Sequence, residues 1–397
     1  MIARRRSHIT TYDFSVALNA FFSRRPPPSL IADLEQAFAS YAGSRHAIAV
    51  GSGRLGMRLI LQSLKLQPQD EVIIPAYTLK DLIAIIQGLG LKAVPADIEP
   101  RSFNIDPASV EKRIGSRTKV IMAAHIFGNP CSMERLREIA RRNSLALLED
   151  CAHAAGSKIN GKSVGTFSDA SFFSFETIKP VNAYGGGMIL TDKDEIAAEI
   201  RDTLRSTLSP GAFPYKKLFA AWCENLFLPT PFSFPAFYLL SLPSTSKLMY
   251  SFYRKSQRIC SRSQGLNPYQ AAIAVRKLAC LEQRVLRRRE KAEALKRVLP
   301  PQVLAQRINE GDFANYYFFV ALLPCDAARV RRELLRYGVD AGIGSEIADD
   351  CAEALGYSDC PVMKDVFSRA IQLPLYEKIS FPQLSRIAAA LKGSLQR

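Results

Sequence analysis

One lysine in this sequence stands between an apolar run and a row of glycines. Ala170–Phe175 contains small and aromatic residues, Lys179 follows it, and Gly185–Gly187 come next. The run is typical of a buried strand, and the glycines let backbone pass close to a ligand. A lysine held at such a place can form a Schiff base with a carbonyl compound, whereas a lysine in an ordinary connection points into solvent. Both interpretations fit this stretch taken alone.

A second stretch, LALLEDCAHAAG, places carboxylates at the end of another apolar run. Leu145–Leu148 lead into Glu149 and Asp150, and His153 follows. A carboxylate at the end of a buried strand needs a partner. One such partner is the protonated ring nitrogen of pyridoxal phosphate (PLP), whose chemistry pairs a Schiff-base lysine with an acidic residue at the pyridinium. His153 could contact the ring or its phenolic oxygen. The structural alternatives are a helix N-cap for Asp150 and a core histidine for His153.

A third stretch, AVGSGRLGMRLIL, joins a predicted strand to a predicted helix. The strand ends at Val50, and Gly51–Gly53 precede the helix. Backbone N–H groups at a helix start can bind a phosphate, so this turn is a candidate phosphate site. An ordinary strand-to-helix turn has the same pattern.

The elements that must position these residues alternate between strand and helix from about residue 45 to residue 205. The predicted strands are His46–Val50, Glu71–Ala76, Ala93–Ile98, Val120–Phe127, Leu145–Glu149, Ala170–Phe175 and Gly187–Thr191. The predicted helices are Leu55–Leu66, Leu79–Gly88, Met133–Asn143 and Asp194–Leu208. This alternation predicts an α/β domain with a mostly parallel sheet, in which ligands bind at the strand ends.

The pattern changes after residue 265. Pro268–Leu299 is predicted as one long helix, Phe313–Leu323 as a strand and Ala327–Tyr337 as a helix. We therefore expect an N-terminal arm (1–28), a large domain (29–265) and a small C-terminal domain that begins with the long helix (266–397).

The composition narrows the class of protein. Lys and Arg (53) exceed Asp and Glu (37) by 16 in 397 residues, which favours anionic partners, but no nucleic-acid-binding motif is present. No apolar run is long enough to span a membrane, and the N-terminus does not resemble a secretory signal. The eight cysteines show no zinc spacing, so we expect no metal site, and they are typical of buried thiols in a cytosolic protein.

An aromatic-rich insertion occupies residues 210–263. Prolines at 229, 231, 235 and 243 divide it, so it cannot form one spanning helix. Lysines and arginines flank its apolar parts. One interpretation is a segment that packs against the body or an oligomer interface. The other is a membrane-surface patch, with aromatics at the interface and cations toward anionic lipid.

Together and in this order, the three stretches resemble the DegT/DnrJ/EryC1/StrS family of PLP-dependent sugar aminotransferases, of the aspartate-aminotransferase fold (fold type I). The resemblance runs from about Leu30 to Thr191 and resumes from Gly265 to the C-terminus. Further matching segments are EVIIPAYT (Glu71–Thr78), AVPADIEPRSFNIDPASVEKRI (Ala93–Ile114), AHIFGNPCSM (Ala124–Met133), LNPYQAA (Leu266–Ala272) and LPLYEKIS (Leu373–Ser380). The resemblance implies a large PLP-binding domain, with a mostly parallel sheet flanked by helices, and a smaller C-terminal α/β domain.

The resemblance also implies roles for matching residues. Lys179 is expected to hold PLP and to shuttle the proton, Asp150 to keep the ring nitrogen protonated, and His153 to lie near the phenolic oxygen. The residues expected to bind the phosphate are Ser174 and the turn of Ser52, Gly53 and Arg54. Because the family works as a homodimer with the site at the interface, Asn267 is a candidate to reach the neighbouring subunit's cofactor.

Three positions depart from the family pattern. Arg54 stands where threonine is usual, so it could pair with the phosphate or select a different anion. Leu79 stands where the family usually has an aromatic residue that stacks on the cofactor ring. Either Tyr77 stacks on the ring instead, or this stacking is lost. Gly185 replaces an acidic residue.

The sequence therefore predicts a cytoplasmic PLP-dependent aminotransferase. It would move an amino group from glutamate onto a nucleotide-linked keto-sugar. The reaction would belong to cell-surface polysaccharide or glycoconjugate biosynthesis. The alternatives are a lipid-linked or non-sugar keto substrate, and a non-catalytic relative that serves as a regulator or assembly partner. Lys179 argues against a dehydratase, because the related sugar dehydratases carry histidine there. Under the membrane-surface interpretation of the insertion, residues 210–263 would contact the inner face of the membrane peripherally.

Overall fold

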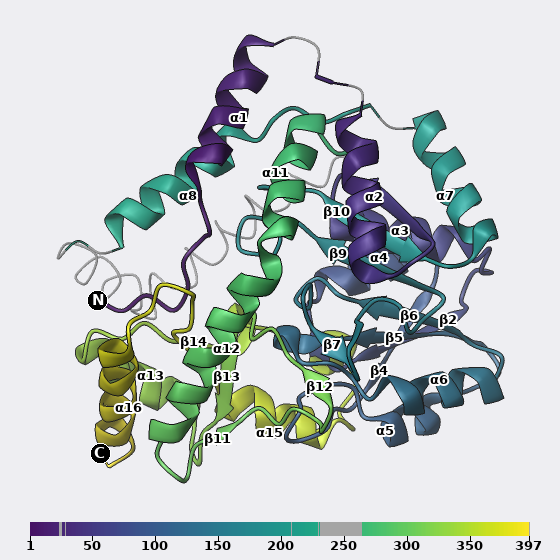
Figure 1. The fold of residues 1–397 in the computed structure, drawn as a ribbon. Coiled ribbons are helices and arrows are strands. Elements are labelled where there is room, and N and C mark those ends of the chain that lie inside the picture. The colour runs from purple at the N-terminus through teal and green to yellow at the C-terminus, as the bar shows by residue number, and fades with distance from the viewer. Residues whose placement is uncertain (24–25, 28, 208, 229, 231–263, 397) are drawn as a thin grey trace.

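A seven-stranded sheet forms the centre of the larger part of the molecule. The computed structural model describes residues 1–23, 26–27, 29–207, 209–228, 230 and 264–396. The strand order is β1-β10-β9-β6-β5-β2-β4 (Figure 1). Only β10 runs against its neighbours, so the sheet is mostly parallel. The strands are β1 (His46–Val50), β2 (Glu71–Pro75), β4 (Lys92–Ala96), β5 (Thr118–Ala124), β6 (Ala146–Asp150), β9 (Ala170–Ser174) and β10 (Gly187–Thr191).

Helices cover both faces of this sheet because its strands are apolar on both sides. On one face, Val72, Met122 and Ile189 pack under α3 (Gly53–Ser63), α4 (Asp81–Gly88) and α7 (Asp194–Thr207). The other face packs against α2 (Leu30–Ala42), α5 (Pro107–Arg113), α6 (Met133–Arg142) and α11 (Pro268–Ala279). The predicted α/β fold with a mostly parallel sheet is confirmed.

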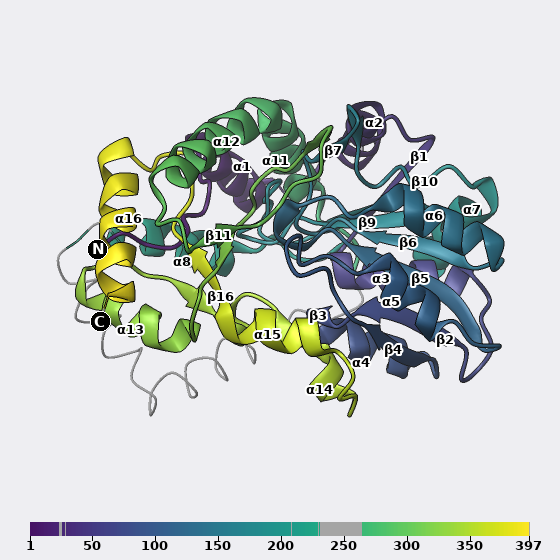
Figure 2. The same ribbon diagram turned by 90° about the horizontal axis from the view of Figure 1, so that it is seen from below.

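A smaller α/β unit follows α11. Its sheet has the order β11-β13-β16-β14, and α12, α13 and α16 share its apolar core. Figure 2 shows these three helices together with β11 and β16 in one half of the molecule. Two small sheets join the smaller unit to the larger one. In one of them β3 pairs with β15, and in the other β7 lies between β12 and β8. The strands are β3 (Tyr77–Thr78), β7 (Lys158–Ile159), β8 (Lys162–Ser163), β11 (Leu304–Ala305), β12 (Asp312–Phe313), β13 (Phe319–Leu322), β14 (Gly342–Ile343), β15 (Asp349–Asp350) and β16 (Ala370–Leu373). The helices are α12 (Leu281–Val298), α13 (Ala327–Arg336), α14 (Cys351–Ala354), α15 (Pro361–Arg369) and α16 (Phe381–Leu395).

Three element predictions were wrong. The single helix Pro268–Leu299 is two helices that meet at Cys280, because α11 packs on α2 whereas α12 packs on α16. The strand Phe313–Leu323 is interrupted between β12 and β13, where Tyr316 has a φ of 50°. The strand predicted to reach Phe127 ends at Ala124 and gives way to a 3-10 turn, Ile126–Gly128.

The N-terminal residues contact both parts of the molecule. Ile2 pairs with Val339 of the smaller unit, and α1 (Thr11–Phe22) packs on α11. Beyond α7 lies α8 (Tyr215–Phe227), the described portion of the aromatic insertion, whereas residues 231–263 lie outside the described residues. The domain limits at residues 28 and 265 stay predictions.

Two predictions from the composition can be compared with the described residues. None of the helices described is both long enough and apolar enough to cross a membrane. The seven described cysteines are free thiols.

Candidate active site

Lys179 lies in the loop that joins β9 to β10. Two backbone N–H groups, those of Ala183 and Gly185, donate to the Phe175 carbonyl at 2.8 and 3.1 Å. The Phe175 N–H donates to the Gly186 carbonyl at 2.9 Å. These bonds close the loop on itself and fix the backbone from which the lysine side chain projects.

The Lys179 side chain is half-buried and faces an aromatic ring. Its ammonium lies 4.8 Å from the centroid of the Tyr317 ring. Burial lowers the pKa of Lys179 to about 8, although the carboxylates of Asp150 and Glu176 oppose this shift. More of the lysine is therefore unprotonated near neutral pH than of an ordinary lysine, and an unprotonated amine is a nucleophile toward carbonyl carbon.

Asp150 ends β6, the strand beside β9. Its carboxylate is buried, and Oδ1 accepts a hydrogen bond from the Ala152 N–H at 2.9 Å. Burial raises the pKa of Asp150, while the backbone N–H and the Lys179 ammonium act against that rise. Turns rather than a helix follow Asp150, so it is not a helix N-cap.

His153 is buried and neutral. Its Nδ1 accepts a hydrogen bond from the Phe127 N–H at 3.3 Å, so this nitrogen carries no proton. Burial, together with the Lys179 ammonium, lowers the pKa of His153 well below its ordinary value. The proton of the neutral imidazole is therefore on Nε2. The alternative of a core histidine accounts for the burial of His153. Its electrostatic interaction with Lys179, however, places His153 in the same site as that lysine.

Sequence reasoning missed Tyr317, whose ring contacts both His153 and Lys179. The Tyr317 and His153 rings are stacked, with centroids 4.3 Å apart and planes at 21°. Asn315 sets this position: its Oδ1 accepts from the Tyr317 N–H at 2.7 Å, and its Nδ2 donates to the carbonyls of His153 and Ala155 at 2.9 and 2.8 Å. The aromatic run NYYFF gave no sign of this role, because it has the pattern of a buried strand.

The predicted phosphate turn lies beside the end of β9. The Ser52 hydroxyl caps α3 by accepting from the Leu55 N–H at 3.1 Å. A Cβ on Gly53 would lie 3.2 Å from the Cβ of Ser174, and a Cβ on Gly187 would lie 2.8 Å from the Gly53 nitrogen. Ser52, Gly53 and Ser174 are thus together at the start of α3. This close approach is possible because glycine has no side chain.

Arg54, the next residue of this turn, is already paired. Its guanidinium donates to the Asp81 carboxylate at 2.9 Å. It is nevertheless close enough to Lys179 to help lower the pKa of the lysine. An anion at the turn would therefore share Arg54 with Asp81.

The other two predicted cofactor residues, Tyr77 and Asn267, make their contacts with other parts of the chain. Tyr77 is fully buried, with its ring edge-to-face on Phe127 at a centroid distance of 5.9 Å, and its hydroxyl has no hydrogen-bond partner among the described residues. Asn267 caps α11: Oδ1 accepts from the Tyr269 N–H at 2.9 Å and Nδ2 donates to the Gly211 carbonyl at 2.8 Å. The side chain of Asn267 is thus hydrogen-bonded within its own chain.

A lysine from α8 also reaches this site. The Lys217 ammonium lies 2.6 Å from the carboxylate of Glu176, three residues before Lys179. Although burial opposes ionisation of Glu176, Lys217 and the Thr177 N–H hold the pKa of this carboxyl below its usual range. The sequence contains no signal for this pair, because its members are 41 residues apart.

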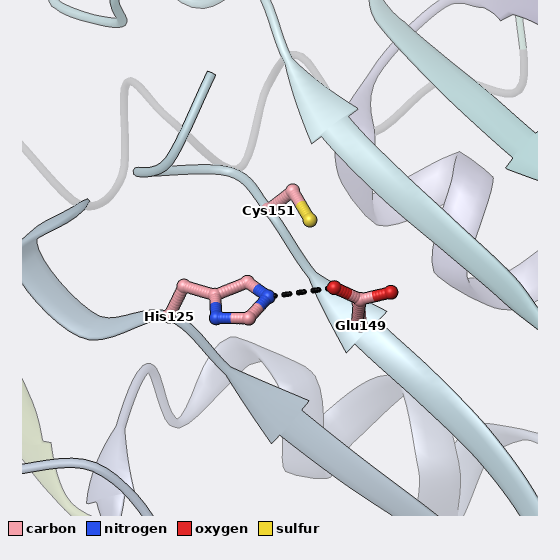
Figure 3. A group of neighbouring side chains, drawn as sticks. All are labelled: His125, Glu149 and Cys151. Carbon is pink, nitrogen blue, oxygen red and sulfur yellow. Dashed lines mark hydrogen bonds and ion pairs between the residues drawn. The ribbon is translucent and has the colours of Figure 1, made fainter. Parts of the chain in front are cut away.

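A buried group with three potential metal ligands includes the two residues that flank Asp150 in the sequence (Figure 3). It consists of His125, Glu149 and Cys151. The His125 Nε2 is 2.9 Å from Glu149, and its Nδ1 accepts from the Cys131 N–H at 2.9 Å. Burial raises the pKa of Cys151 well above its ordinary value, so it stays a thiol. Glu149 also accepts hydrogen bonds from the Gly165 N–H, the Phe167 N–H and the Ser168 hydroxyl. Because both imidazole nitrogens and the carboxylate are engaged, this group is a structural polar pair rather than a metal site.

Comparison with known proteins adds a family match. The model of the DegT/DnrJ/EryC1/StrS aminotransferase family matches residues 28–392. A GDP-perosamine synthase of Caulobacter vibrioides is 40% identical over 171 residues, which are 43% of this chain and 46% of that protein. A pleiotropic regulatory protein of Geobacillus stearothermophilus is 41% identical over 169 residues, 42% of this chain and 45% of that protein. The matched segments thus span about half the length of these curated relatives.

Solved structures share the fold over the whole chain. The aminotransferase TlmJ from Streptoalloteichus hindustanus has a TM-score of 0.79 at 21% identity, covering 100% of this chain and 99% of that one. Helicobacter pylori PseC, an aminotransferase involved in the biosynthesis of pseudoaminic acid, has a TM-score of 0.80 at 18% identity, with 100% and 99% coverage. At these identities the similarity establishes the fold alone.

Proposed function

Because the chain belongs to the DegT/DnrJ/EryC1/StrS family of PLP-dependent aminotransferases, we propose that it transfers an amino group from an amino acid, glutamate, to a nucleotide-linked keto-sugar in cell-surface polysaccharide or glycoconjugate biosynthesis. The observation that carries this proposal is a lysine with a pKa of about 8 whose amine interacts electrostatically with the buried carboxylate of Asp150. A nucleophilic amine and a buried carboxylate are the two groups that PLP requires from a protein.

The residues present fit this cofactor. Lys179 would attach its aldehyde, and Asp150 would pair with its ring nitrogen. Ser174, the Ser52 hydroxyl and the backbone of Gly53 and Arg54 would hold the phosphate at the start of α3, where the close approach of Gly53 to Ser174 forms a cradle that a side chain would fill. When bound, PLP supplies an electron sink for the carbon that loses its proton.

The chain's own residues supply proton transfer and orientation. Lys179 Nζ, which can be neutral near pH 8, would take the proton from the donor's α-carbon in the first half-reaction and would deliver a proton to the acceptor carbon in the second. The buried Asp150 provides a negative charge that favours a protonated partner. His153 keeps its proton on Nε2 and can donate it to an oxygen in the site. The Tyr317 ring, stacked on His153, shields the Lys179 amine from water on one side.

The proposed partners follow from the same assignment. We place the enzyme in the cytoplasm as a homodimer with its site at the subunit interface, acting on an amino-acid donor and a keto-sugar acceptor. Asn267 would need to exchange its bonds to Tyr269 and Gly211 before reaching a neighbouring subunit's cofactor.

An absorbance spectrum tests the proposal. Purified protein with added PLP is expected to show the visible band of a lysine-bound cofactor, and glutamate is expected to bleach it. Lys179→Ala should show neither change, and Lys162→Ala, an exposed lysine on β8, should behave as the wild type. A wild type without a bound band would refute the role of Lys179, and a band that glutamate leaves unchanged would refute glutamate as the donor.

A regulatory role is the second candidate. It is supported by the similarity of 42% of this chain to a pleiotropic regulatory protein. A regulator that has lost catalysis would fail the spectral test in both the wild type and Lys179→Ala.

A further inference from the structure

A short stretch of the N-terminal segment passes the active-site loop. It is fixed at its start, where the Arg4 guanidinium is bonded to two carboxylates of the smaller unit. It is fixed again at its end, where the His8 carbonyl accepts a hydrogen bond from the Asn182 side chain at 3.0 Å. Asn182 belongs to the loop that carries Lys179. Arg5 lies between these two attachments, so its backbone is held between the smaller unit and that loop.

The two arginines that flank Arg5 contact the smaller unit, whereas the charge of Arg5 acts on Lys179. Arg4 is bonded to carboxylates, and the Arg6 guanidinium lies 5.6 Å from the centroid of the Tyr376 ring. Burial is the main cause of the lowered pKa of Lys179, and the positive charge of Arg5 lowers this pKa further. Because the effect of one charge on another falls off with distance, Arg5 lies near the lysine amine.

Arg5 differs from other cations around this loop in having no partner. Four of those cations are each paired with a carboxylate: Arg54 with Asp81 at 2.9 Å, Lys217 with Glu176 at 2.6 Å, Lys277 with Asp13 at 2.8 Å and Arg284 with Glu377 at 3.1 Å. Within the described part of the chain, the Arg5 guanidinium has neither an ion pair nor a hydrogen bond, and the residue is half-buried. A half-buried guanidinium without an anion beside it is a candidate to bind an anionic ligand.

An amino-acid donor carries such an anion at the required place. Its α-carboxylate is bonded directly to the carbon from which Lys179 would take the proton. Since reacting atoms must approach to about 3–3.5 Å, the α-carboxylate has to lie beside the Lys179 amine during proton transfer. A guanidinium can bind a carboxylate through two parallel hydrogen bonds, which fix the orientation of the carboxylate as well as its position.

We propose that Arg5 binds the α-carboxylate of the amino-acid donor and so orients the α-carbon toward Lys179. This inference rests on the proposed aminotransferase function and assigns a residue to its donor subsite. The other anions of the reaction are poorer ligands for Arg5. The cofactor phosphate has its own donors in the turn of Ser52, Gly53 and Arg54 at the start of α3. The phosphates of a nucleotide-linked sugar are separated from the reacting carbon by part of the sugar ring.

Binding of a donor analogue that cannot react tests the proposal. 2-Methylglutamate has the amine and both carboxylates of glutamate but no α-proton, so its dissociation constant reports donor binding without proton transfer. In titration calorimetry of the full-length, PLP-loaded protein, Arg5→Met should weaken this binding roughly 10- to 100-fold, as expected for a lost hydrogen-bonded ion pair. Arg5→Lys keeps the charge but not the paired hydrogen bonds, so it should recover part of the affinity.

Two comparisons separate this role from a structural one. Affinity for PLP, measured by titration of the apo-protein, should be unchanged in both Arg5 variants, whereas a distorted site would lose it. The matched control, Arg135→Met, removes an exposed arginine of α6 and should bind the analogue as the wild type does. Thermal melting and the bound-cofactor spectrum verify that every variant is folded and loaded.

The assignment of Arg5 is overturned if Arg5→Met binds 2-methylglutamate as tightly as the wild type. It is equally overturned if that variant loses affinity only for PLP, or only for inorganic pyrophosphate as a probe of the acceptor's phosphates, since Arg5 would then bind a phosphate. A wild type with no bound-cofactor band, or with a band that glutamate leaves unchanged, would refute the proposed function and the role of Arg5 with it. A wild type that glutamate bleaches, beside an Arg5→Met variant that it bleaches equally well at every concentration, would refute the role of Arg5 alone.

Discussion

The ammonium of Lys277 lies 2.8 Å from the Asp13 carboxylate, and both side chains are fully buried. The same carboxylate accepts from the Tyr184 hydroxyl at 2.6 Å, and the same ammonium donates to the Asn182 side chain at 3.1 Å. Asn182 and Tyr184 belong to the loop between Lys179 and Gly187. The pair therefore fastens α1 and α11 to the back of the loop that carries the candidate nucleophile.

Removing this ammonium should destabilise the protein strongly. Lys277→Met leaves Asp13 buried and without its cation, so we expect the free energy of unfolding to fall by about 3–5 kcal/mol. Denaturation in urea measures the change. The control is Lys65→Met, whose exposed ion pair with Glu199 should contribute less than about 1 kcal/mol. Equal unfolding curves for the two variants would show that the buried pair does not hold the loop.

Cofactor capture should depend on pH through Lys179. Only the neutral amine attacks the PLP aldehyde, and the pKa of Lys179 is about 8. The rate of capture by the apo-protein should therefore rise roughly tenfold per pH unit below pH 8 and level off above it. Stopped-flow absorbance measures this rate. A rate that keeps rising to pH 10 would indicate an ordinary, solvated lysine.

The variant Asp150→Asn tests the direction in which the Asp150 carboxylate shifts the pKa of Lys179. The Asp150 carboxylate raises the pKa of Lys179, so its removal should lower that pKa further and move the plateau to lower pH. The same stopped-flow series detects the shift. A plateau that stays in place, or moves to higher pH, would contradict the interaction between these two groups.

The contact of α8 with the active-site loop should affect cofactor affinity. Lys217→Met removes the partner of the Glu176 carboxylate, so we expect PLP to bind roughly tenfold more weakly. Lys216→Met, one position away and exposed, should bind PLP as the wild type does. Equilibrium titration of each apo-protein gives the comparison, and identical affinities would mean that the Lys217–Glu176 pair is incidental.

The glycine at the start of β10 should tolerate no side chain. A Cβ on Gly187 would lie 2.5 Å from the Phe173 carbonyl oxygen and 2.8 Å from the Gly53 nitrogen. Gly187→Ala should lower the free energy of unfolding by about 1–3 kcal/mol or more and weaken PLP binding. Gly88→Ala, where a Cβ meets nothing within 4 Å, should be neutral or slightly stabilising. If the two variants unfold with the same free energy, the backbone around Gly187 accommodates a Cβ more easily than the structure indicates.

Much of the large sheet could be predicted from the sequence because its strands are short apolar runs. Strands β6 and β9 are buried along most of their length, and the polar residue that ends each run faces the ligand-binding edge of the sheet. Lys179, Asp150 and His153 were singled out from the sequence for the same reason, since each follows such a run closely. Their side chains come together because parallel strands end at one edge.

The parts that were missed depend on contacts between distant residues. Asn315 interrupts a strand-like run because its side chain satisfies the carbonyls of His153 and Ala155, which no local pattern records. The helix break at Cys280 reflects two different packing partners, α2 and α16. The α1 helix is apolar on its exposed side, so its hydrophobic pattern gave no indication of which side packs against α11.

The first thirteen residues have a consequence for synthesis of the chain. The Ile2 N–H donates to the Gly338 carbonyl at 2.8 Å, Arg4 is paired with Asp340 and Glu346, and Asp13 is paired with Lys277. During translation the N-terminus is made first, yet each of these partners emerges from the ribosome hundreds of residues later. The loop that holds Lys179 can therefore be fastened from behind only after Lys277 has emerged, nearly one hundred residues after the loop itself, so this part of the active site is completed late in folding.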